Sequence, residues 1–245
     1  VEGLQGVSYK APLGRLKETV DIIRMGFRGD KIRYEGKHFT LPLPGGEGKA
    51  IRLDHPPRDI PIYLATLGPK SLEYTGASAD GWLGTSFSPD HAGAHMDHLK
   101  KGAADAGRSL QDMDLHSSCS VAVGENVQEL IDAYKPGVAF SMGAMGSEKT
   151  NFYNDAFKRA GYTDDAVAIQ RLWKDGKRQE AIDRVPDEMV TEFGAVGTED
   201  MVRKRFETYR DAGINSLTLR MDANLEISQR IAHLEQIMDL LPDHD

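Results

Sequence analysis

The chain has 245 residues and a mass of 27.0 kDa, which suits one or two domains or a single α/β barrel. Asp and Glu (38) outnumber Lys and Arg (30), and the formal net charge of −8 argues against a basic nucleic-acid-binding or membrane-binding face. The single cysteine excludes a disulfide framework and a cysteine-based zinc site, so we expect a reducing, cytoplasmic setting. The chain starts with Val rather than Met, and we therefore expect a piece of a longer protein.

The first sixty residues predict a helix, a hairpin and a long loop. Pro12 suits the first helical position, and the apolar residues that follow recur at helical spacing, which predicts a helix over 12–27. Alternating apolar residues around a Glu-Gly-Lys turn predict a hairpin over 31–41. Residues 42–60 are rich in Pro and Gly and predict a loop, and loops of this length are usually functional or mobile.

The rest of the chain alternates short apolar runs with segments of helical periodicity, which predicts a parallel sheet in an α/β fold. The predicted strands are about 61–66, 81–86, 116–123 and 214–221. The predicted helices are 70–79, 88–106, 126–134, 152–160, 164–173, 179–184, one that Thr198 caps, and a last one striped by Ile227, Ile231, Leu234, Met238 and Leu241. Residues 136–195 are otherwise irregular.

One turn predicts an anion site. In the segment 61–71 a buried strand ends, Gly68 allows a tight turn, and Pro69 opens a helix. The free backbone N–H groups of Lys70, Ser71 and Leu72 then face outward at the positive end of the helix dipole, where they can hold a phosphate. A plain strand-to-helix turn explains the same residues about equally well. Thr85 and Ser86 end the next strand, where their hydroxyls are expected to face whatever lies over the sheet.

Three histidines and one cysteine carry weaker signals. His91, His95 and His98 have the spacing of metal ligands on a helix, but they lie away from its apolar stripe, and we expect a solvated face rather than a metal site. Cys119 lies inside a predicted strand and is expected to be a small core residue. The sequence contains no nucleophile elbow and no H-E-x-x-H motif, so the residues alone predict no reaction.

Eight segments carry a resemblance to a known family. Two of them are Met145–Asn154 and Val185–Met189. The others are Pro12–Arg24, Tyr34–Phe39, Pro61–Lys70, Ala77–Trp82, Ala195–Thr198 and Ala212–Gly213. Taken together they resemble the luciferase-like monooxygenase superfamily, and the first two resemble its branch that uses the deazaflavin coenzyme F420. The resemblance implies a TIM (β/α)8 barrel of bacterial-luciferase type, of which this chain holds strands 5–8. It also implies one partial barrel domain over 1–245, with insertions at 31–60 and about 136–195.

The resemblance further implies an oxidoreductase that moves hydride between coenzyme F420 and an organic substrate, commonly as a homodimer. Carried over by position, the cofactor-binding residues would be Ala65, Thr66, Leu67, Gly68, Pro69, Lys70, Ser71, Thr85 and Ser86. Catalytic groups in related enzymes come largely from the first strands, so no residue of this sequence is assigned as catalytic. In the sugar-phosphate dehydrogenase branch a lysine follows the Thr-Ser pair; here Phe87 and Ser88 follow it, so that substrate is not predicted.

Other readings stay open at this point. FMN could replace F420, as in the luciferase-like monooxygenases, or the chain could be a non-catalytic fragment that binds cofactor only. An aldolase-type phosphate-binding barrel would need a Schiff-base lysine inside a strand, and none of the predicted strands offers one. Residues 42–60 and 136–160 are expected to cover the barrel mouth and to determine specificity.

Overall fold

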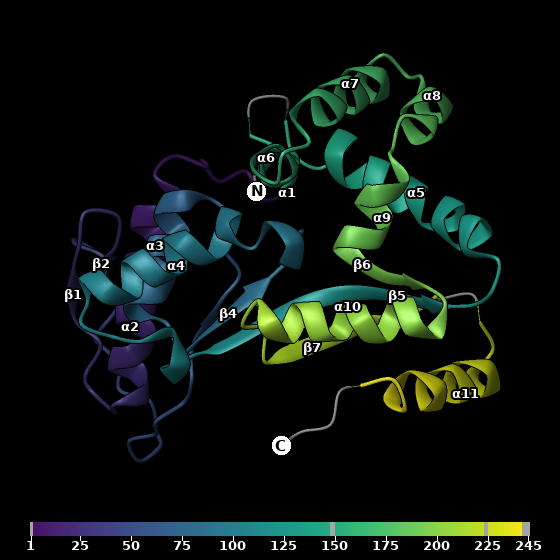
Figure 1. Cartoon of the computed structure of the whole chain (residues 1–245). Coiled ribbons are helices and arrows are strands. Elements are labelled where there is room, and N and C mark those ends of the chain that lie inside the picture. The colour runs from purple at the N-terminus through teal and green to yellow at the C-terminus, as the bar shows by residue number, and fades with distance from the viewer. Residues whose placement is uncertain (1, 148–149, 223–224, 242–245) are drawn as a thin grey trace. The chain divides into compact units, whose positions relative to one another are not determined.

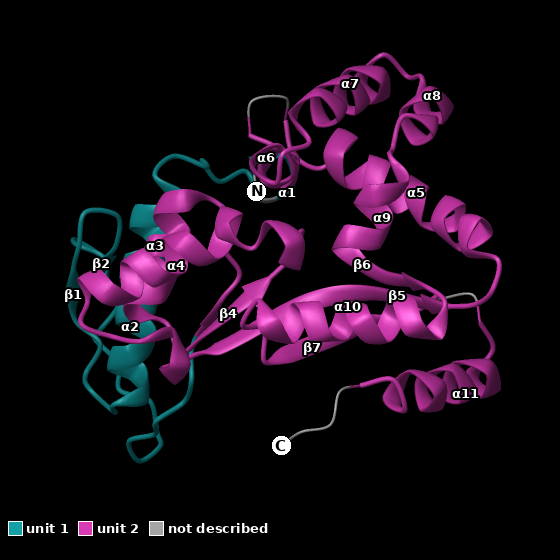
Figure 2. Cartoon of the chain, in the orientation of Figure 1, with its two compact units in different colours: residues 1–62 teal, residues 63–245 magenta. Residues whose placement is uncertain are grey.

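A computed structural model describes residues 2–147, 150–222 and 225–241 (Figure 1). The chain divides into two compact units, residues 1–62 and 63–245 (Figure 2). None of the described helices is long and apolar enough to cross a membrane. The single partial barrel domain expected over 1–245 stays a prediction.

In the first unit the structure confirms the predicted helix over 12–27, the hairpin within 31–41 and the loop over 42–60. The elements of this unit are α1 (Glu2–Gln5), α2 (Pro12–Phe27), β1 (Tyr34–Glu35) and β2 (Thr40–Leu41). The two strands pair antiparallel, and the Glu18 carboxylate on α2 accepts backbone N–H bonds from Lys37, His38 and Phe39 at 2.8–2.9 Å. Burial raises the pKa of Glu18, but these donors outweigh it and lower the pKa. Residues 42–62 hold no helix or strand.

The second unit is built on a parallel sheet, as the alternating pattern predicts. Its strands are β3 (Tyr63–Leu64), β4 (Gly81–Gly84), β5 (Asp114–Val123), β6 (Gly194–Gly197) and β7 (Ser216–Arg220). β5 is the long central strand: β7 pairs along one of its edges, while β4 and β6 pair in turn with its first and second halves. The four predicted strands are confirmed, and β6 is an addition that the sequence analysis missed.

Helices connect and cover these strands. They are α3 (Pro69–Ser78), the 3-10 turn η1 (Pro89–His91), α4 (Gly93–Asp105), the 3-10 turn η2 (Leu110–Asp112), α5 (Val127–Gly143), α6 (Phe152–Arg159), α7 (Thr163–Lys174), α8 (Arg178–Asp183), α9 (Asp187–Phe193), α10 (Glu199–Asp211) and α11 (Ile227–Met238). α10 packs on β5 and β6 (Figure 1). The Thr198 hydroxyl caps α10 by accepting from the Met201 N–H at 3.4 Å.

One helical prediction is wrong in its end point, and one helix has no predicted counterpart. α5 does not end at residue 134 but continues through Pro136 to Gly143, because Ile131, Ala139 and Met142 form one buried face that outweighs the hydrogen bond lost at the proline. α9 was not predicted at all, although Met189 and Val190 on it are buried. α9 and the second half of α5 lie in the stretch 136–195, where the sequence pattern is least regular.

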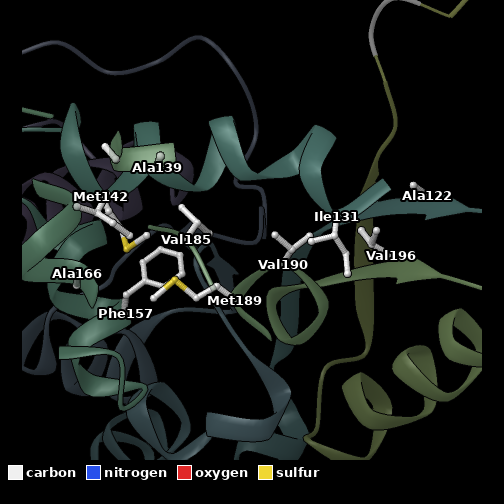
Figure 3. Packing of buried hydrophobic residues seen from close by; sticks show 12 residues of the cluster. Ala122, Ile131, Ala139, Met142, Phe157, Ala166, Val185, Met189, Val190 and Val196 are labelled. Atoms are coloured by element: carbon white, nitrogen blue, oxygen red, sulfur yellow. The ribbon is translucent and has the colours of Figure 1, made fainter. Parts of the chain in front are cut away.

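α5 to α9 enclose a hydrophobic core that also takes in Ala122 of β5 and Val196 of β6 (Figure 3). Met142, Phe157 and Met189 point toward one another there, and Ile169 is fully buried with them. At the other end of this core, Ile131 and Val190 meet Val196 of β6, which ties the helical segment to the sheet. Burying this many apolar side chains holds the insertion in one arrangement beside the strand ends.

In the last helix, α11, the residues of the expected apolar stripe are not the ones that pack against the protein. Ile227, Ile231, Leu234 and Met238 are all exposed in the described part of the chain, Ile227 by 75%. α11 is instead anchored near its C-terminal end, where Ile237 and Leu240 are buried. The spacing identified an apolar helix correctly but not the residues that pack.

Candidate functional site

A cavity of about 470 Å³ opens at the carboxyl ends of the parallel strands. Thr85 and Ser86 follow β4, Ser118 and Ser120 lie in the second half of β5, and Arg220 is the last residue of β7. Ligands of open parallel sheets bind at this end of the strands. The volume also lies within the roughly 300–1,000 Å³ of small-molecule and cofactor pockets.

The helical insertion forms the other wall of the cavity. Its lining residues are mostly aromatic or apolar: Tyr134, Val138, Phe140, Met145, Tyr153, Phe157, Met189, Val190 and Phe193, with Gly137 and Ser141 between them. The Phe157 and Phe193 rings lie 4.4 Å apart between centroids. Within the described residues, 137–145 and 153–157 therefore line the cavity beside the strand ends. The expectation that 136–160 covers a barrel mouth stays a prediction. The covering role of 42–60, in the other unit, stays a prediction.

The two tyrosines of this wall differ in their hydrogen bonding. Tyr134 donates to the Val121 carbonyl at 3.0 Å, which fixes its ring over β5, and burial raises the pKa of its phenol. Tyr153 also lines the cavity, and within the described residues its hydroxyl has no hydrogen-bond partner. Tyr153 is thus the lining phenol that is available to a bound molecule.

Thr85 and Ser86 lie where the sequence placed them. Both are partly buried and both line the cavity. Ser86 has φ 50, in the left-handed region that non-glycine residues seldom adopt. The following residue, Phe87, is buried against Trp82 and His95, and this packing holds the turn. Backbone strain of this kind is typical of ligand-binding turns.

The turn Ala65–Ser71 has the expected form but does not line the cavity. Gly68 caps α3 with φ −80 and ψ 149, a conformation open to any residue, so the glycine is not needed for the turn itself. A methyl group on Gly68 would meet only the Ser71 hydroxyl, at 3.5 Å, so the space above this residue is open. The Leu72 N–H is not free, as it was expected to be, because it donates to the Gly68 carbonyl at 2.9 Å.

Side chains of this turn make bonds within the protein. The Thr66 hydroxyl is buried against that of Thr75 at 2.8 Å, and the Ser71 hydroxyl donates to the Gly68 carbonyl at 2.8 Å. Lys70 is 80% exposed at its side chain and lies 3.4 Å from the Glu73 carboxylate. The groups that this turn offers to a ligand are therefore mainly backbone groups rather than side chains.

Sequence reasoning missed one cation beside this turn. Arg159, at the end of α6, donates from Nη2 to the Leu67 carbonyl at 2.8 Å. Its Nε is buried and, in the described part of the chain, has no hydrogen-bond partner. Because Tyr153 and Phe157 of the same helix line the cavity, α6 connects the turn with the cavity wall. No local pattern marks this arginine, since the contact joins residues 92 positions apart.

The family model for the luciferase-like monooxygenases matches residues 1–216. The chain belongs to this family. A Mycobacterium tuberculosis protein whose name describes a coenzyme F420-dependent oxidoreductase is 36% identical over 228 residues, 89% of this chain and 66% of that protein. A 5,10-methylenetetrahydromethanopterin reductase of Archaeoglobus fulgidus is 28% identical over 86% of this chain and 61% of its own length.

The fold is also that of a solved coenzyme F420-dependent reductase. The coenzyme F420-dependent tetrahydromethanopterin reductase of Methanopyrus kandleri superposes with a TM-score of 0.71 and 25% identity, over 92% of this chain and 62% of that one. The chain thus spans about two thirds or less of the lengths of the relatives it matches.

In this luciferase-like family member the histidines are not one solvated face. His95 is buried, at 1% exposure, because Trp82 and Phe87 pack around its ring, and burial, with smaller effects of Arg159 and His98, lowers its pKa to about 4. His91 lies outside α4, in η1, with Nε2 3.0 Å from the Glu192 carboxylate. Cys119 is fully buried, as expected, and burial raises the pKa of its thiol to about 11.

Proposed function

We propose that this chain belongs to an oxidoreductase that transfers hydride between coenzyme F420 and an organic substrate. The observation that carries the proposal is the cavity: aromatic and apolar on the insertion side, hydroxyl-rich on the strand side, and placed at the carboxyl ends of parallel strands. The 36% identity to the mycobacterial protein named for F420 supports this cofactor. Because the chain spans only part of its relatives, the activity is a proposal for the protein as a whole.

The residues present fit such a cofactor at two places. We propose that the cofactor's phosphate lies over the turn formed by Ala65, Thr66, Leu67, Gly68, Pro69, Lys70 and Ser71. The open space above Gly68 supports close approach of a ligand to the backbone, and Lys70 and Ser71 begin a helix whose positive dipole end attracts anions. We propose that Thr85 and Ser86 lie against the ring or the substrate, which their place in the cavity wall supports.

The chemistry of hydride transfer is supplied by the deazaflavin ring when it is bound. The chain's own residues bind, orient and exclude water. Phe157 and Phe193 form an apolar wall that keeps solvent from the reacting atoms, and the hydroxyls of Thr85 and Ser86 can orient polar edges opposite it. The phenol of Tyr153 can donate a hydrogen bond or a proton to a substrate oxygen.

Blocking the cavity tests whether it is the cofactor site. A side chain at Gly137 of α5, which lines the cavity, has open space because an added Cβ meets no atom within 4 Å. We expect Gly137→Trp to weaken F420 binding at least tenfold in a titration followed by the coenzyme's own fluorescence. Gly137→Ala is the matched control and should bind normally. Unchanged affinity in Gly137→Trp would place the cofactor elsewhere.

An FMN-dependent monooxygenase is the second candidate, because the matching family model is that of the luciferase-like monooxygenases. The same cavity would then hold FMN, with its phosphate at the same turn. A non-catalytic fragment that binds cofactor only is the third possibility, and it predicts F420 or FMN binding without turnover. Titration with both cofactors, followed by an assay for oxidation of the reduced coenzyme, separates the three.

We further propose that β3, β4, β5 and β7 correspond to strands 5–8 of a (β/α)8 barrel of bacterial-luciferase type. The superposition on the Methanopyrus kandleri reductase supports this assignment. We also propose a homodimer, on the family resemblance, and a cytoplasmic location, on the single cysteine. Light scattering of the purified protein tests the dimer.

A further inference from the structure

The cavity contains one charged side chain among the described residues that line it, and that residue is Arg220. The other polar groups of the wall are hydroxyls, chiefly on Thr85, Ser86, Ser118 and Ser120. A guanidinium in such a wall is permanently protonated and has five N–H donors. The cavity therefore presents positive charge to its occupant, although the chain as a whole carries −8.

The strand pairing fixes the position of Arg220. It is the last residue of β7 and lies in register with Ser120 of β5, at the ligand-binding end of the sheet. Its Nη2 donates to the Ser118 hydroxyl at 3.3 Å, and no carboxylate of the described residues forms an ion pair with it. One long hydrogen bond to a neutral hydroxyl leaves most of its donors unused by the protein.

We propose that Arg220 binds an acidic group, a carboxylate or a phosphate, of the substrate, and that the cavity therefore selects anionic organic substrates. This inference rests on the proposed function, because it takes the cavity as the reaction site. A planar guanidinium pairs with both oxygens of such a group. Arg220 is exposed, so its remaining donors are accessible to a bound anion. The neighbouring serine hydroxyls can complete the hydrogen bonding of the bound anion.

The coenzyme is itself a phosphate-containing molecule, so the same chemistry has two possible sources. If Arg220 binds the coenzyme's anion, its removal weakens binding of F420 but not of the phosphate-free deazaflavin chromophore. If it binds the substrate's anion, its removal leaves both cofactor affinities unchanged and weakens acidic substrates only. The proposal commits to the second source.

The test uses three variants and matched probes. Arg220→Gln removes the charge, Arg220→Lys keeps it without the planar fork, and Arg171→Gln removes an arginine from the exposed surface of α7 as the control. Benzoate and phenyl phosphate are the acidic probes, and benzamide is the neutral one. Their binding to F420-saturated protein is measured by calorimetry, alongside the affinities for F420 and for its phosphate-free chromophore.

We expect the unaltered protein and Arg171→Gln to bind at least one acidic probe more tightly than benzamide. The affinity of Arg220→Gln for that probe should fall at least tenfold, while its affinity for F420 should be unchanged. The affinity of Arg220→Lys for the probe should lie between those of Arg220→Gln and the unaltered protein. No preference for either acidic probe, equal binding by Arg220→Gln, or a loss of F420 affinity with the chromophore unaffected would each overturn the proposal. Failure of the unaltered protein to bind F420 would instead refute the proposed function, and this inference with it.

Discussion

Two glycines set the distance between α3 and α4, and adding a methyl group to either tests that packing. A Cβ on Gly102 of α4 would lie 1.8 Å from the Glu73 carbonyl oxygen, and one on Gly76 of α3 would lie 2.1 Å from the Leu99 carbonyl oxygen. Both clashes are with backbone, which cannot move aside by changing a rotamer. Gly102→Ala therefore forces the two helices apart by roughly 1.5 Å to reach ordinary contact.

Two opposing effects determine the stability of Gly102→Ala. Alanine is favoured over glycine inside a helix by about 1 kcal/mol. Overpacking costs about 1–3 kcal/mol even where side chains can adjust, and here the fully buried Leu72 and Leu99 would also lose contacts. The steric cost exceeds the propensity gain, and we expect a net loss of about 2 kcal/mol in the free energy of unfolding.

Urea unfolding, followed by tryptophan fluorescence, measures this loss. We expect the midpoint of Gly102→Ala to fall by roughly 1 M with an unchanged slope. The same substitution at Gly137 of α5 is the control: it meets no atom, so it should raise stability by about 0.5–1 kcal/mol. A Gly102→Ala variant as stable as the unaltered protein would refute the close approach of α3 and α4.

Two further predictions concern the cofactor turn and a buried histidine. Gly68→Ala should leave stability unchanged, because φ is −80 and the methyl group meets only the Ser71 hydroxyl. It should weaken F420 binding several-fold if the phosphate lies over this turn. Equal F420 affinities of Gly68→Ala and the unaltered protein would show that the phosphate lies elsewhere. His95 has a folded-state pKa of about 4, below the 6.5 of an unfolded chain, so the unfolded state binds the proton first. The contribution of the neutral His95 ring to the free energy of unfolding is complete above pH 6.5. As the pH falls toward 4, this contribution is lost, and the free energy of unfolding drops by up to about 3 kcal/mol. His95→Phe should unfold with a weaker pH dependence over this range, and identical curves for the two proteins would contradict the buried neutral ring.

Much of the α/β layout could be predicted from the sequence, because its signals are local. The runs at 61–66, 81–86, 116–123 and 214–221 all contain strands. Along β5 and β7 more buried and less buried residues largely alternate, which is the period of a strand. β6 was missed because Gly194–Gly197 is short and made of small residues, a pattern that also fits a loop. Its four residues are buried because β5, α10, α9 and α5 surround them.

The site was harder to predict, because it depends on contacts between distant segments. Thr85 and Ser86 were identified by their place at a strand end, and they do line the cavity. Tyr153, Arg159 and Arg220 were not, because their roles follow from where α6 and β7 lie relative to β5. His95 was expected in solvent because the helical wheel does not show that Trp82 and Phe87 close over that side of α4.

We propose that the cavity belongs to an F420-dependent oxidoreductase of the luciferase-like family. A parallel fluorescence titration of one protein preparation with F420 and with FMN tests this assignment most directly, because it gives the ratio of the two dissociation constants. We predict that F420 binds more tightly than FMN. Tighter binding of FMN, or no binding of F420, would contradict the account.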